Sequence, residues 1–420
     1  MCYHVKPYLS ARNKEMSPIL PEEQLHILRS GTAQIVPESA LLDKLKKGTT
    51  LNIKLGVDPT APDIHLGHAV PLRKLRSFQD LGHHVTLIIG DGTARVGDPS
   101  GRNSTRPQLS AEAIMENAQT YVDQAFKILD PEKTTLRYNS EWLLSLTLED
   151  LLGVTANFTV ARILERDDFN KRYNEHQPIS LHEFLYPVMQ AYDSVIIEAD
   201  VEIGGTDQLF NLLAGRELME KMGMEPQVCL TLPLLEGTDG VQKMSKSYGN
   251  YIGLTDEPSD MFGKVMSIPD ELMVKYYRLA STLSVDEIDK IEEGLANDSL
   301  HPNEVKRALG RNIVSAYYDE ASANAAEEQF NQVFKQHELP DDIKVFEIDL
   351  TPNEEGLVYL AKLLVDVELT STAGEARRLI DGGGVKVNGE ALKPKNYNIA
   401  PEKLEGAVLQ VGKRKFARLA

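Results

Sequence analysis

Hydrophobic residues in the first quarter of the chain form two continuous runs separated by a helical spacing. Residues 51–58 (LNIKLGVD) are an apolar, β-prone run, and residues 83–91 (HHVTLIIGD) are a second run of the kind found in parallel sheets. Between them, residues 65–80 carry apolar side chains at helical spacing. A strand, a helix and a strand in this order predict a βαβ unit, and therefore an α/β domain.

The pattern changes several times after this unit. A glycine-rich loop follows the second run, and residues 110–200 then show mostly helical spacing, which interrupts the α/β pattern. Residues 201–208 and 227–235 return to that pattern, and residues 260–340 are again helical in spacing. Residues 341–356 are typical of a linker.

The last part of the chain predicts a small mixed domain. Residues 357–367 (LVYLAKLLVDV) favour a helix, and the Asn-Gly pair at 388–389 predicts a tight hairpin turn. We see no internal repeat and no low-complexity tract. The predicted organisation is a lead-in at 1–34, a first domain at 35–258 with a helical insertion at about 110–200, a helical domain at 259–345 and a tail domain at 353–420.

Composition adds limits rather than new features. The chain has 420 residues, enough for two or three domains, with 42% hydrophobic and 26% charged residues, as in ordinary globular proteins. Cys2 and Cys229 are too few for a disulfide framework or a cysteine metal cluster. No apolar run approaches the roughly 18 residues of a membrane span, and the N-terminus lacks the apolar centre of a secretory signal. We therefore expect a cytoplasmic protein.

Charge is divided unevenly along the chain. The net charge is −18, but residues 370–420 carry ten Lys/Arg against five Asp/Glu, a net +5. The other 369 residues carry 35 Lys/Arg against 58 Asp/Glu, a net −23. A basic tail on an acidic body indicates a polyanion partner for the tail, although a solvated basic face would have the same composition.

The first motif with chemical meaning is His65-Leu66-Gly67-His68, at the start of the predicted helix. Unpaired N–H groups and the dipole of a helix N-terminus attract phosphate, and two histidines add side-chain donors. Gly67 lets a flat ring such as adenine lie against the backbone. A metal site is the alternative, but no third ligand stands at a matching spacing, so we predict no protein-bound metal.

The second motif is KMSKS, with Lys243 and Lys246 in a loop bounded by Gly240 and Gly249. Mobile ammonium groups can close over a triphosphate and follow its charge to the leaving pyrophosphate. A solvated loop with two lysines is common, so this motif alone is weak. An HxGH motif near the start of a parallel α/β domain, with KMSKS at its end, is highly specific.

Together these motifs resemble those of the class I aminoacyl-tRNA synthetases, and more closely the bacterial tyrosyl-tRNA synthetases. Residues 97–106 (GDPSGRNSTR), 186–193 (YPVMQAYD) and 204–208 (GGTDQ) match that family's substrate motifs in order and spacing. The resemblance extends from about residue 35 to the end. It implies an α/β fold: a Rossmann-type parallel-sheet catalytic domain, then an α-helical anticodon-stem domain and a small α+β RNA-binding domain.

The resemblance implies two reaction steps. The tyrosine carboxylate attacks the α-phosphate of ATP, with Mg²⁺, to give tyrosyl-adenylate and pyrophosphate, and the 3′ end of tRNA(Tyr) then takes the tyrosyl group. Catalysis is positioning plus stabilisation of phosphate charge. The residues that match the family's catalytic positions are His65, His68, Lys243, Lys246, Arg102 and Arg106. Those that match its ATP-binding positions are Asp58, Thr60, Gly67, Gly205, Asp207 and Lys246.

Tyrosine brings an ammonium, a carboxylate and a phenol. By resemblance, Asp98, Tyr186 and Gln190 accept from the ammonium, Gln208 lies near the carboxylate and Asp193 accepts from the phenol. Tyr186 and Gln190 are four residues apart and share a helix face. This enzyme type is itself the standard example of a site that rejects phenylalanine by about 10⁵-fold without editing, because its buried polar groups would be left unpaired.

One tyrosine-binding position departs from the family pattern. Well-known members carry a tyrosine at the end of the first strand as a second partner for the phenol, whereas this chain has Lys54. We expect Lys54 either to donate to the phenol oxygen or to pair with Asp193.

The basic tail resembles the S4 type of RNA-binding domain. Phosphate contacts there would make RNA binding depend on salt. The predicted tRNA-binding residues are Arg377, Arg378, Lys386, Lys393, Lys395, Lys413, Arg414 and Lys415. Residues 157–169 resemble the family's subunit interface, so a homodimer is expected.

Three other functions fit parts of the sequence. A small HxGH nucleotidylyltransferase would need neither KMSKS nor an RNA-binding tail. A tryptophan-specific synthetase usually lacks the basic tail, and Asp193 suits a phenol. A non-catalytic RNA-binding paralogue would not need both intact catalytic motifs.

Overall fold

The structure is a computed structural model of the whole chain, in which the described residues are 19–59, 64–99, 110–335, 343–348, 350–353, 356–412 and 415–420. It divides into two compact units. The first comprises Met1–Glu257 and Lys264–Glu320, and the second comprises Pro258–Gly263 and Ala321–Ala420. The predicted division into a catalytic, a helical and a tail domain stays a prediction.

The first unit is built on a six-stranded sheet with the order β1-β6-β5-β2-β3-β4. All neighbouring strands are parallel except β1 and β6, so the sheet is mixed at one edge. Its strands are β1 (Gln34–Val36), β2 (Asn52–Val57), β3 (His84–Ile89), β4 (Thr134–Tyr138), β5 (Val201–Gly205) and β6 (Val228–Leu232). The five parallel strands have the Rossmann order, with its reversal point between β2 and β5.

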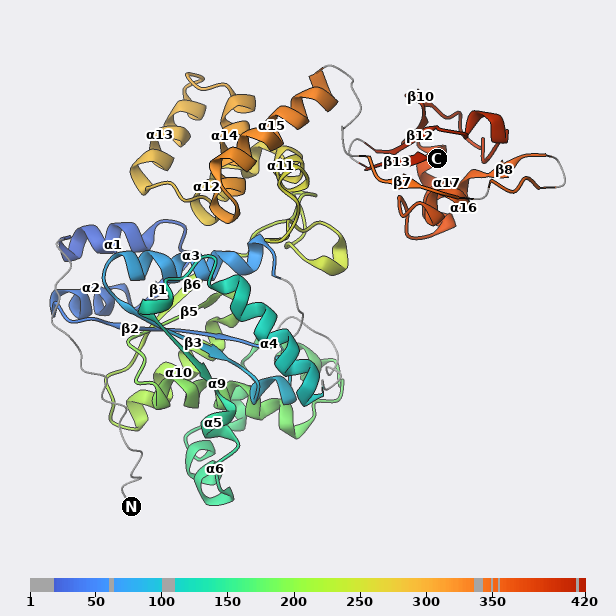
Figure 1. Ribbon diagram of the computed structural model, residues 1–420. Coiled ribbons are helices and arrows are strands. Elements are labelled where there is room, and N and C mark those ends of the chain that lie inside the picture. Colours follow the sequence, from blue (N-terminus) through green and yellow to red (C-terminus); the bar gives the residue numbers. More distant parts are fainter. Residues whose placement is uncertain are drawn as a thin grey trace. The chain divides into compact units, whose positions relative to one another are not determined.

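Helices cover both faces of this sheet (Figure 1). Helices α1 and α3 lie on one side, and α9 and α10 on the other. The helices of this unit are α1 (Pro21–Arg29), α2 (Glu38–Lys46), α3 (Leu66–Asp80), α4 (Ala111–Ala125), α5 (Ser140–Leu143), α6 (Leu148–Thr155), α7 (Val160–Ile163), α8 (Asp167–Asn174), α9 (Leu185–Ile196), α10 (Leu209–Lys221), α12 (Met273–Ala280), α13 (Val285–Ala296) and α14 (Pro302–Tyr317). The buried strands β3 and β6 are almost continuously apolar because both sheet faces are covered.

Four 3₁₀ turns position residues of interest in this unit: η1 (Thr93–Arg95), η3 (Leu181–Phe184), η4 (Thr206–Gln208) and η5 (Lys246–Tyr248). Two more, η2 (Pro131–Lys133) and η6 (Asp270–Leu272), connect elements. Helix α11 (Pro258–Met266) crosses the division between the units, and α15 (Glu320–Lys335) begins at it.

The second unit contains a five-stranded sheet, β10-β9-β12-β13-β7, and a two-stranded sheet, β11-β8. Helices α16 (Leu360–Asp366) and α17 (Ala373–Asp381) pack with them around a core that includes Leu360, Leu364 and Ile380. Its strands are β7 (Val345–Phe346), β8 (Val358–Tyr359), β9 (Val385–Val387), β10 (Glu390–Ala391), β11 (Asn398–Ile399), β12 (Val408–Val411) and β13 (Lys415–Leu419), with η7 at Pro401–Lys403.

The hairpin predicted at 388–389 is confirmed. Asn388 and Gly389 have φ values of 49° and 84°, and they connect the antiparallel strands β9 and β10. Positive φ at both central residues is the geometry that the Asn-Gly pair favours.

The structure differs from three expectations about elements. The segment 110–200 is mostly helical, as predicted, but it does not wholly interrupt the α/β pattern, because β4 within it is an edge strand of the main sheet, paired with β3. The stretch predicted as a linker contains β7, which pairs with β13. The tail helix begins at Leu360, since Val358–Tyr359 forms β8. In the described part of the chain, no helix is long and apolar enough to cross a membrane.

Candidate active site

A cavity of about 330 Å³ opens at the carboxyl ends of β2 and β5, where the strand order reverses. Open α/β sheets bind their ligands at this point. Loops after the four strands β2, β3, β4 and β5 and one face of α9 supply much of its lining: Asp58, Gly90, Thr93, Asp98, Asn139, Tyr186, Gln190, Asp193, Asp207 and Gln208. Residues predicted from separate parts of the sequence therefore lie around one cavity.

His65 and His68 lie at the start of α3, and His68 lines the cavity. Their rings stack with centroids 3.9 Å apart. The His65 backbone N–H donates to His68 Nδ1 at 3.3 Å, which leaves the proton of a neutral His68 on Nε2. Burial lowers the pKa of His68 to about 4, and Lys246 adds to this.

His65 exposes less of its surface than His68 does. Burial, and then His68 and Lys246, lower its pKa to about 3. Its Nδ1 is buried and has no hydrogen-bond partner among the described residues. A Cβ on Gly67 would lie 3.0 Å from this ring, so glycine keeps the helix start clear. Both imidazoles are neutral at pH 7 and offer hydrogen bonds rather than charge.

The segment after KMSKS pairs with the segment that enters the HxGH motif. The backbone N–H of Leu66 donates to Ile252 O at 2.9 Å, and that of Leu254 donates to Ile64 O at 3.2 Å. His65 and Gly253 form an isolated antiparallel bridge between them. Two motifs about 180 residues apart in the sequence are thus held side by side at the cavity.

Buried residues anchor the KMSKS loop. The Met244 side chain is buried, and Asn250 accepts from the Ser245 backbone N–H at 2.8 Å while donating to Asp239 Oδ2 at 2.9 Å. Lys243 remains exposed. Lys246 Nζ lies 5.8 Å from the ring centroid of Tyr251. The loop backbone is fixed on its inner side, whereas its first lysine extends outward.

Two carboxylates frame the middle of the cavity, the first being Asp58. It accepts from the Tyr186 hydroxyl at 2.9 Å and from Thr93 Oγ1 at 2.7 Å. Burial, and then Asp58, raise the pKa of Tyr186 well above its usual range, so this phenol stays protonated. A Cβ on Gly90 would lie 2.1 Å from Asp58 Oδ1, and glycine is therefore required beside this carboxylate.

The second carboxylate is Asp98. It accepts from Gln208 Nε2 at 2.8 Å and pairs with Arg166 Nη2 at 2.9 Å. The Arg166 guanidinium is buried and also donates to Asn211 at 3.1 Å. Asp98 and Gln208 were predicted from motifs, but Arg166 was missed because nothing in its local sequence marks it.

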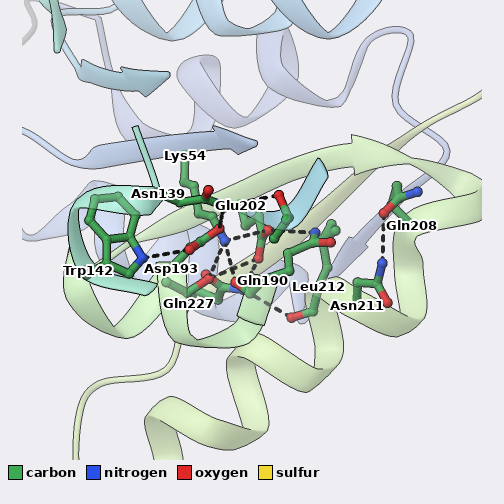
Figure 2. A network of polar contacts seen from close by, with 12 residues as sticks. Lys54, Asn139, Trp142, Gln190, Asp193, Glu202, Gln208, Asn211, Leu212 and Gln227 are labelled. Carbon is green, nitrogen blue, oxygen red and sulfur yellow. Dashed lines mark hydrogen bonds and ion pairs between the residues drawn. The ribbon is translucent and has the colours of Figure 1, made fainter. Parts of the chain in front are cut away.

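Asp193 closes the inner end of the cavity. It accepts from the Trp142 indole N–H at 2.8 Å and from Asn139 Nδ2 at 3.2 Å, as Figure 2 shows. Burial raises its pKa to about 6, although Lys54 opposes this rise. Trp142 and Asn139 were not predicted as site residues; they follow β4, the strand that the sequence pattern did not reveal.

Lys54 pairs with a carboxylate other than the expected Asp193. Its ammonium forms an ion pair with Glu202 at 2.8 Å and donates to Gln190 O and Ser194 Oγ at 2.9 and 2.7 Å. The expected pairing with Asp193 is replaced by this ion pair, because Glu202 is the cross-strand neighbour of Lys54 between β5 and β2. Lys54 is not one of the described residues that line the cavity.

The GGTDQ stretch forms the end of β5 and the turn η4. A Cβ on Gly205 would lie 2.4 Å from Asp207 Oδ1, and one on Gly204 would lie 3.0 Å from Gln208 Cβ. Both glycines therefore let the following turn fold back against the strand. Asp207, Gly205 and Gln208 all line the cavity.

In the second unit, the predicted tRNA-binding cations lie at the surface. Those that are exposed are Arg377, Arg378, Lys393, Lys395 and Lys415, and Lys386 is half-buried. Lys415 also donates to Leu369 O at 3.4 Å. The predicted residues that lie outside the described part of the chain are Thr60, Arg102, Arg106, Lys413 and Arg414.

No group of three or more His, Cys, Asp and Glu side chains able to hold a metal occurs in the part of the chain that the structure describes.

The sequence matches the family model for class I tRNA synthetases of the tryptophan and tyrosine type over residues 46–335. It also matches the S4 domain over residues 360–403. The chain is 54% identical over 400 residues to the tyrosine–tRNA ligase of Moorella thermoacetica, covering 94% of this chain and 95% of that protein.

The chain belongs to the tyrosine–tRNA ligase family. The corresponding ligase of Thermotoga maritima is 51% identical, with 95% of this chain and 98% of that protein covered. Among solved structures, the tyrosyl-tRNA synthetase of Archaeoglobus fulgidus complexed with L-tyrosine shares the fold with a TM-score of 0.61 at 23% identity, covering 73% of this chain and 99% of that one. The family membership and the fold class predicted from the motifs are confirmed.

Proposed function

We propose that this protein is a tyrosine–tRNA ligase that makes tyrosyl-adenylate from L-tyrosine and ATP and then esterifies tRNA(Tyr). The observation that carries this proposal is one cavity lined both by Gly67 and His68 of the HxGH motif and by the buried carboxylate of Asp193. The relatives that support it are named as tyrosine–tRNA ligases.

The ATP phosphates lie at the start of α3. Neutral His65 and His68 donate hydrogen bonds to them, and the helix N-terminus adds its unpaired N–H groups. Lys243 and Lys246 close over the β- and γ-phosphates as pyrophosphate leaves. Arg102 and Arg106 act on the same pyrophosphate, a role that rests on the sequence motif.

Adenosine lies between the two glycine-rich stretches. Gly67 lets the base approach the helix backbone, and Gly205 with Asp207 contacts the ribose. Asp58 and Thr60 lie by the adenylate. Mg²⁺ accompanies ATP and neutralises phosphate charge, and the proposed ligands are the phosphates rather than a protein cluster.

Tyrosine lies along α9. Its ammonium is bound by Asp98, Tyr186 and Gln190, and its carboxylate lies by Gln208. Its phenol donates to Asp193, whose other neighbours, Trp142 and Asn139, are both donors. A tryptophan indole would also find an acceptor there, but the relatives named above act on tyrosine.

The second unit binds tRNA. The match to the S4 domain supports this role, and exposed Arg377 and Arg378 on α17 supply phosphate contacts.

The proposed assembly is a homodimer. Its support is a set of exposed apolar side chains between α5 and η3, namely Leu144, Leu148, Leu152, Val160 and Leu181. The cytoplasmic location stays a prediction.

The experiment that tests the proposal is ATP–pyrophosphate exchange with tyrosine, phenylalanine, tryptophan or no amino acid. Exchange that depends on tyrosine supports the ligase. Exchange with tryptophan instead would favour the tryptophan-specific alternative. If folded protein with Mg²⁺ exchanges with none of them, the proposal fails and a non-catalytic RNA-binding paralogue replaces it.

Ending the chain at residue 342 is expected to spare exchange and to lower tRNA charging by at least about 10²-fold, since the basic groups that would contact phosphate are removed. The cut lies before β7, because β7 pairs with β13 and belongs to the tail. It keeps α15, whose Phe330 packs on Phe262 at 5.4 Å. Exchange and charging are measured on the same preparation, and unchanged charging would contradict the tail's role.

A further inference from the structure

A buried ion pair joins the two strands whose ends form the cavity. Lys54 on β2 and Glu202 on β5 are directly paired across the parallel strands, with their charged groups 2.8 Å apart. Their side chains are 0% and 1% exposed. A buried ion pair contributes little net stability compared with apolar residues of similar volume, but losing one partner leaves an uncompensated charge. Stability alone therefore gives little reason for this pair.

Both charges hold the same turn of α9. Lys54 Nζ donates to the Gln190 carbonyl and to Ser194 Oγ, and Glu202 accepts from Gln190 Nε2 at 3.1 Å and from Ser194 Oγ at 3.2 Å. Gln227 on β6 donates to the same carboxylate. Figure 2 shows these contacts converging from the strands onto one side of α9.

This turn of α9 presents the residues proposed to recognise tyrosine. Gln190 and Asp193 line the cavity, whereas Lys54 and Glu202 do not. Because the Gln190 N–H donates to Glu202, its amide oxygen is the end left for the cavity. An acceptor at that position is what a substrate ammonium requires. The ion pair thus selects which end of the amide meets the ligand.

The two charges of the pair act in opposite directions on the pKa of Asp193. Lys54 favours the charged form of Asp193 and Glu202 opposes it. The other groups that contact this carboxylate are the neutral donors Trp142 and Asn139. Removing one member of the pair therefore changes the charge beside Asp193 by one unit, in opposite directions for the two members.

We propose that the Lys54–Glu202 pair is a positioning and specificity element for the tyrosine phenol and ammonium, acting through Asp193 and Gln190 rather than by touching substrate. This inference rests on the proposed tyrosine-binding roles of those two residues. Within the pair, Lys54 favours the carboxylate form of Asp193, which can accept from a phenol, and Glu202 orients Gln190 as an acceptor.

The test uses Lys54→Met, Glu202→Gln and the double variant in the full-length chain. For each, the KM for L-tyrosine in ATP–pyrophosphate exchange is followed over about pH 5 to 8, with kcat at saturating tyrosine. Lys54→Met is expected to move the pH midpoint of tyrosine KM upward by about one unit, and Glu202→Gln to move it downward. The double variant should fall between them, and kcat should change less than KM.

The matched control is Lys44→Met, which breaks another buried ion pair, with Asp200 at 3.1 Å. It should lower stability without moving the midpoint. If Lys54→Met does not fold, the downward shift in Glu202→Gln still decides, since glutamine keeps the shape of Glu202. Midpoints that stay at the wild-type value, or that move in the same direction in both variants, would reduce the pair to a structural role. Wild-type protein without tyrosine-dependent exchange would instead overturn the proposed function.

Discussion

Replacing His68 by alanine is expected to lower the rate of tyrosyl-adenylate formation by about 10²–10³-fold, with the KM for tyrosine nearly unchanged. Preorganised donors aimed at developing phosphate charge have this effect on kcat. His68 lines the cavity at the start of α3, whereas Asp193 and Gln190 lie on α9. The loss should therefore appear at the phosphate end alone. Single-turnover adenylate formation measures it.

The control for this variant is His84→Ala. His84 is half-buried on β3 and contacts Thr135 at 2.8 Å, outside the cavity lining. Its replacement should leave the adenylate rate within a few-fold. His68→Gln, which keeps an amide donor, should recover part of the loss. Equal losses in His68→Ala and His84→Ala would mean that the effect is one of folding.

The histidine pKa values add a pH expectation to the same experiment. They are lowered to about 3 and 4, so the neutral forms persist above pH 4 and are lost only as pH falls through that range. The free enzyme's kcat/KM for ATP should then show no step from these groups between about pH 6 and 8. A step near pH 6.5 that disappears in His68→Ala would contradict the neutral assignment.

The sequence could predict those features whose signal lies in consecutive residues. HxGH and KMSKS are short motifs whose chemistry is local, and the structure brings both to one cavity edge. The apolar runs of β2 and β3 were equally plain because both sheet faces are buried. These features follow from local pattern and composition.

The missed features depend on tertiary pairing. Strand β4 (TTLRY) is half-buried throughout and lies at the sheet edge, so it lacks the apolar run that marked its neighbours. Arg166 became part of the site only through the fold, which brings it to Asp98. Asp193 was the predicted acidic partner of Lys54, whereas the register between β2 and β5 places Glu202 beside it.

One signal for that choice was present in the sequence. A lysine inside an otherwise apolar strand needs a buried partner, because an unpaired buried charge is costly. Glu202 lies inside a second apolar strand, in VEIGG, and needs one for the same reason. Pairing Lys54 with Glu202 gives both buried strand charges a charged partner. Pairing Lys54 with the helix residue Asp193 would leave Glu202 without one.

Asp193→Asn is expected to lower kcat/KM for tyrosine by about 10²-fold, the size of one hydrogen bond to a charged group. Asparagine keeps the shape of Asp193 but removes the carboxylate, and it turns an amide toward Trp142 and Asn139, which are both donors. Phenylalanine has no hydroxyl, so its kcat/KM should change by no more than a few-fold. The ratio of kcat/KM for tyrosine to that for phenylalanine should therefore fall by nearly the same factor as kcat/KM for tyrosine.

The pH dependence of tyrosine binding gives the same carboxylate a second, independent readout. The pKa of Asp193 is raised to about 6 before substrate binds, so the protonated form grows as pH falls through 6. The KM for tyrosine should rise below that pH, because the charged acceptor is lost, and phenylalanine should show no such rise. In Asp193→Asn the tyrosine profile should become as flat as that for phenylalanine. A rise that persists in this variant would assign the titration to another group, and the phenol would then need a different acceptor in the cavity.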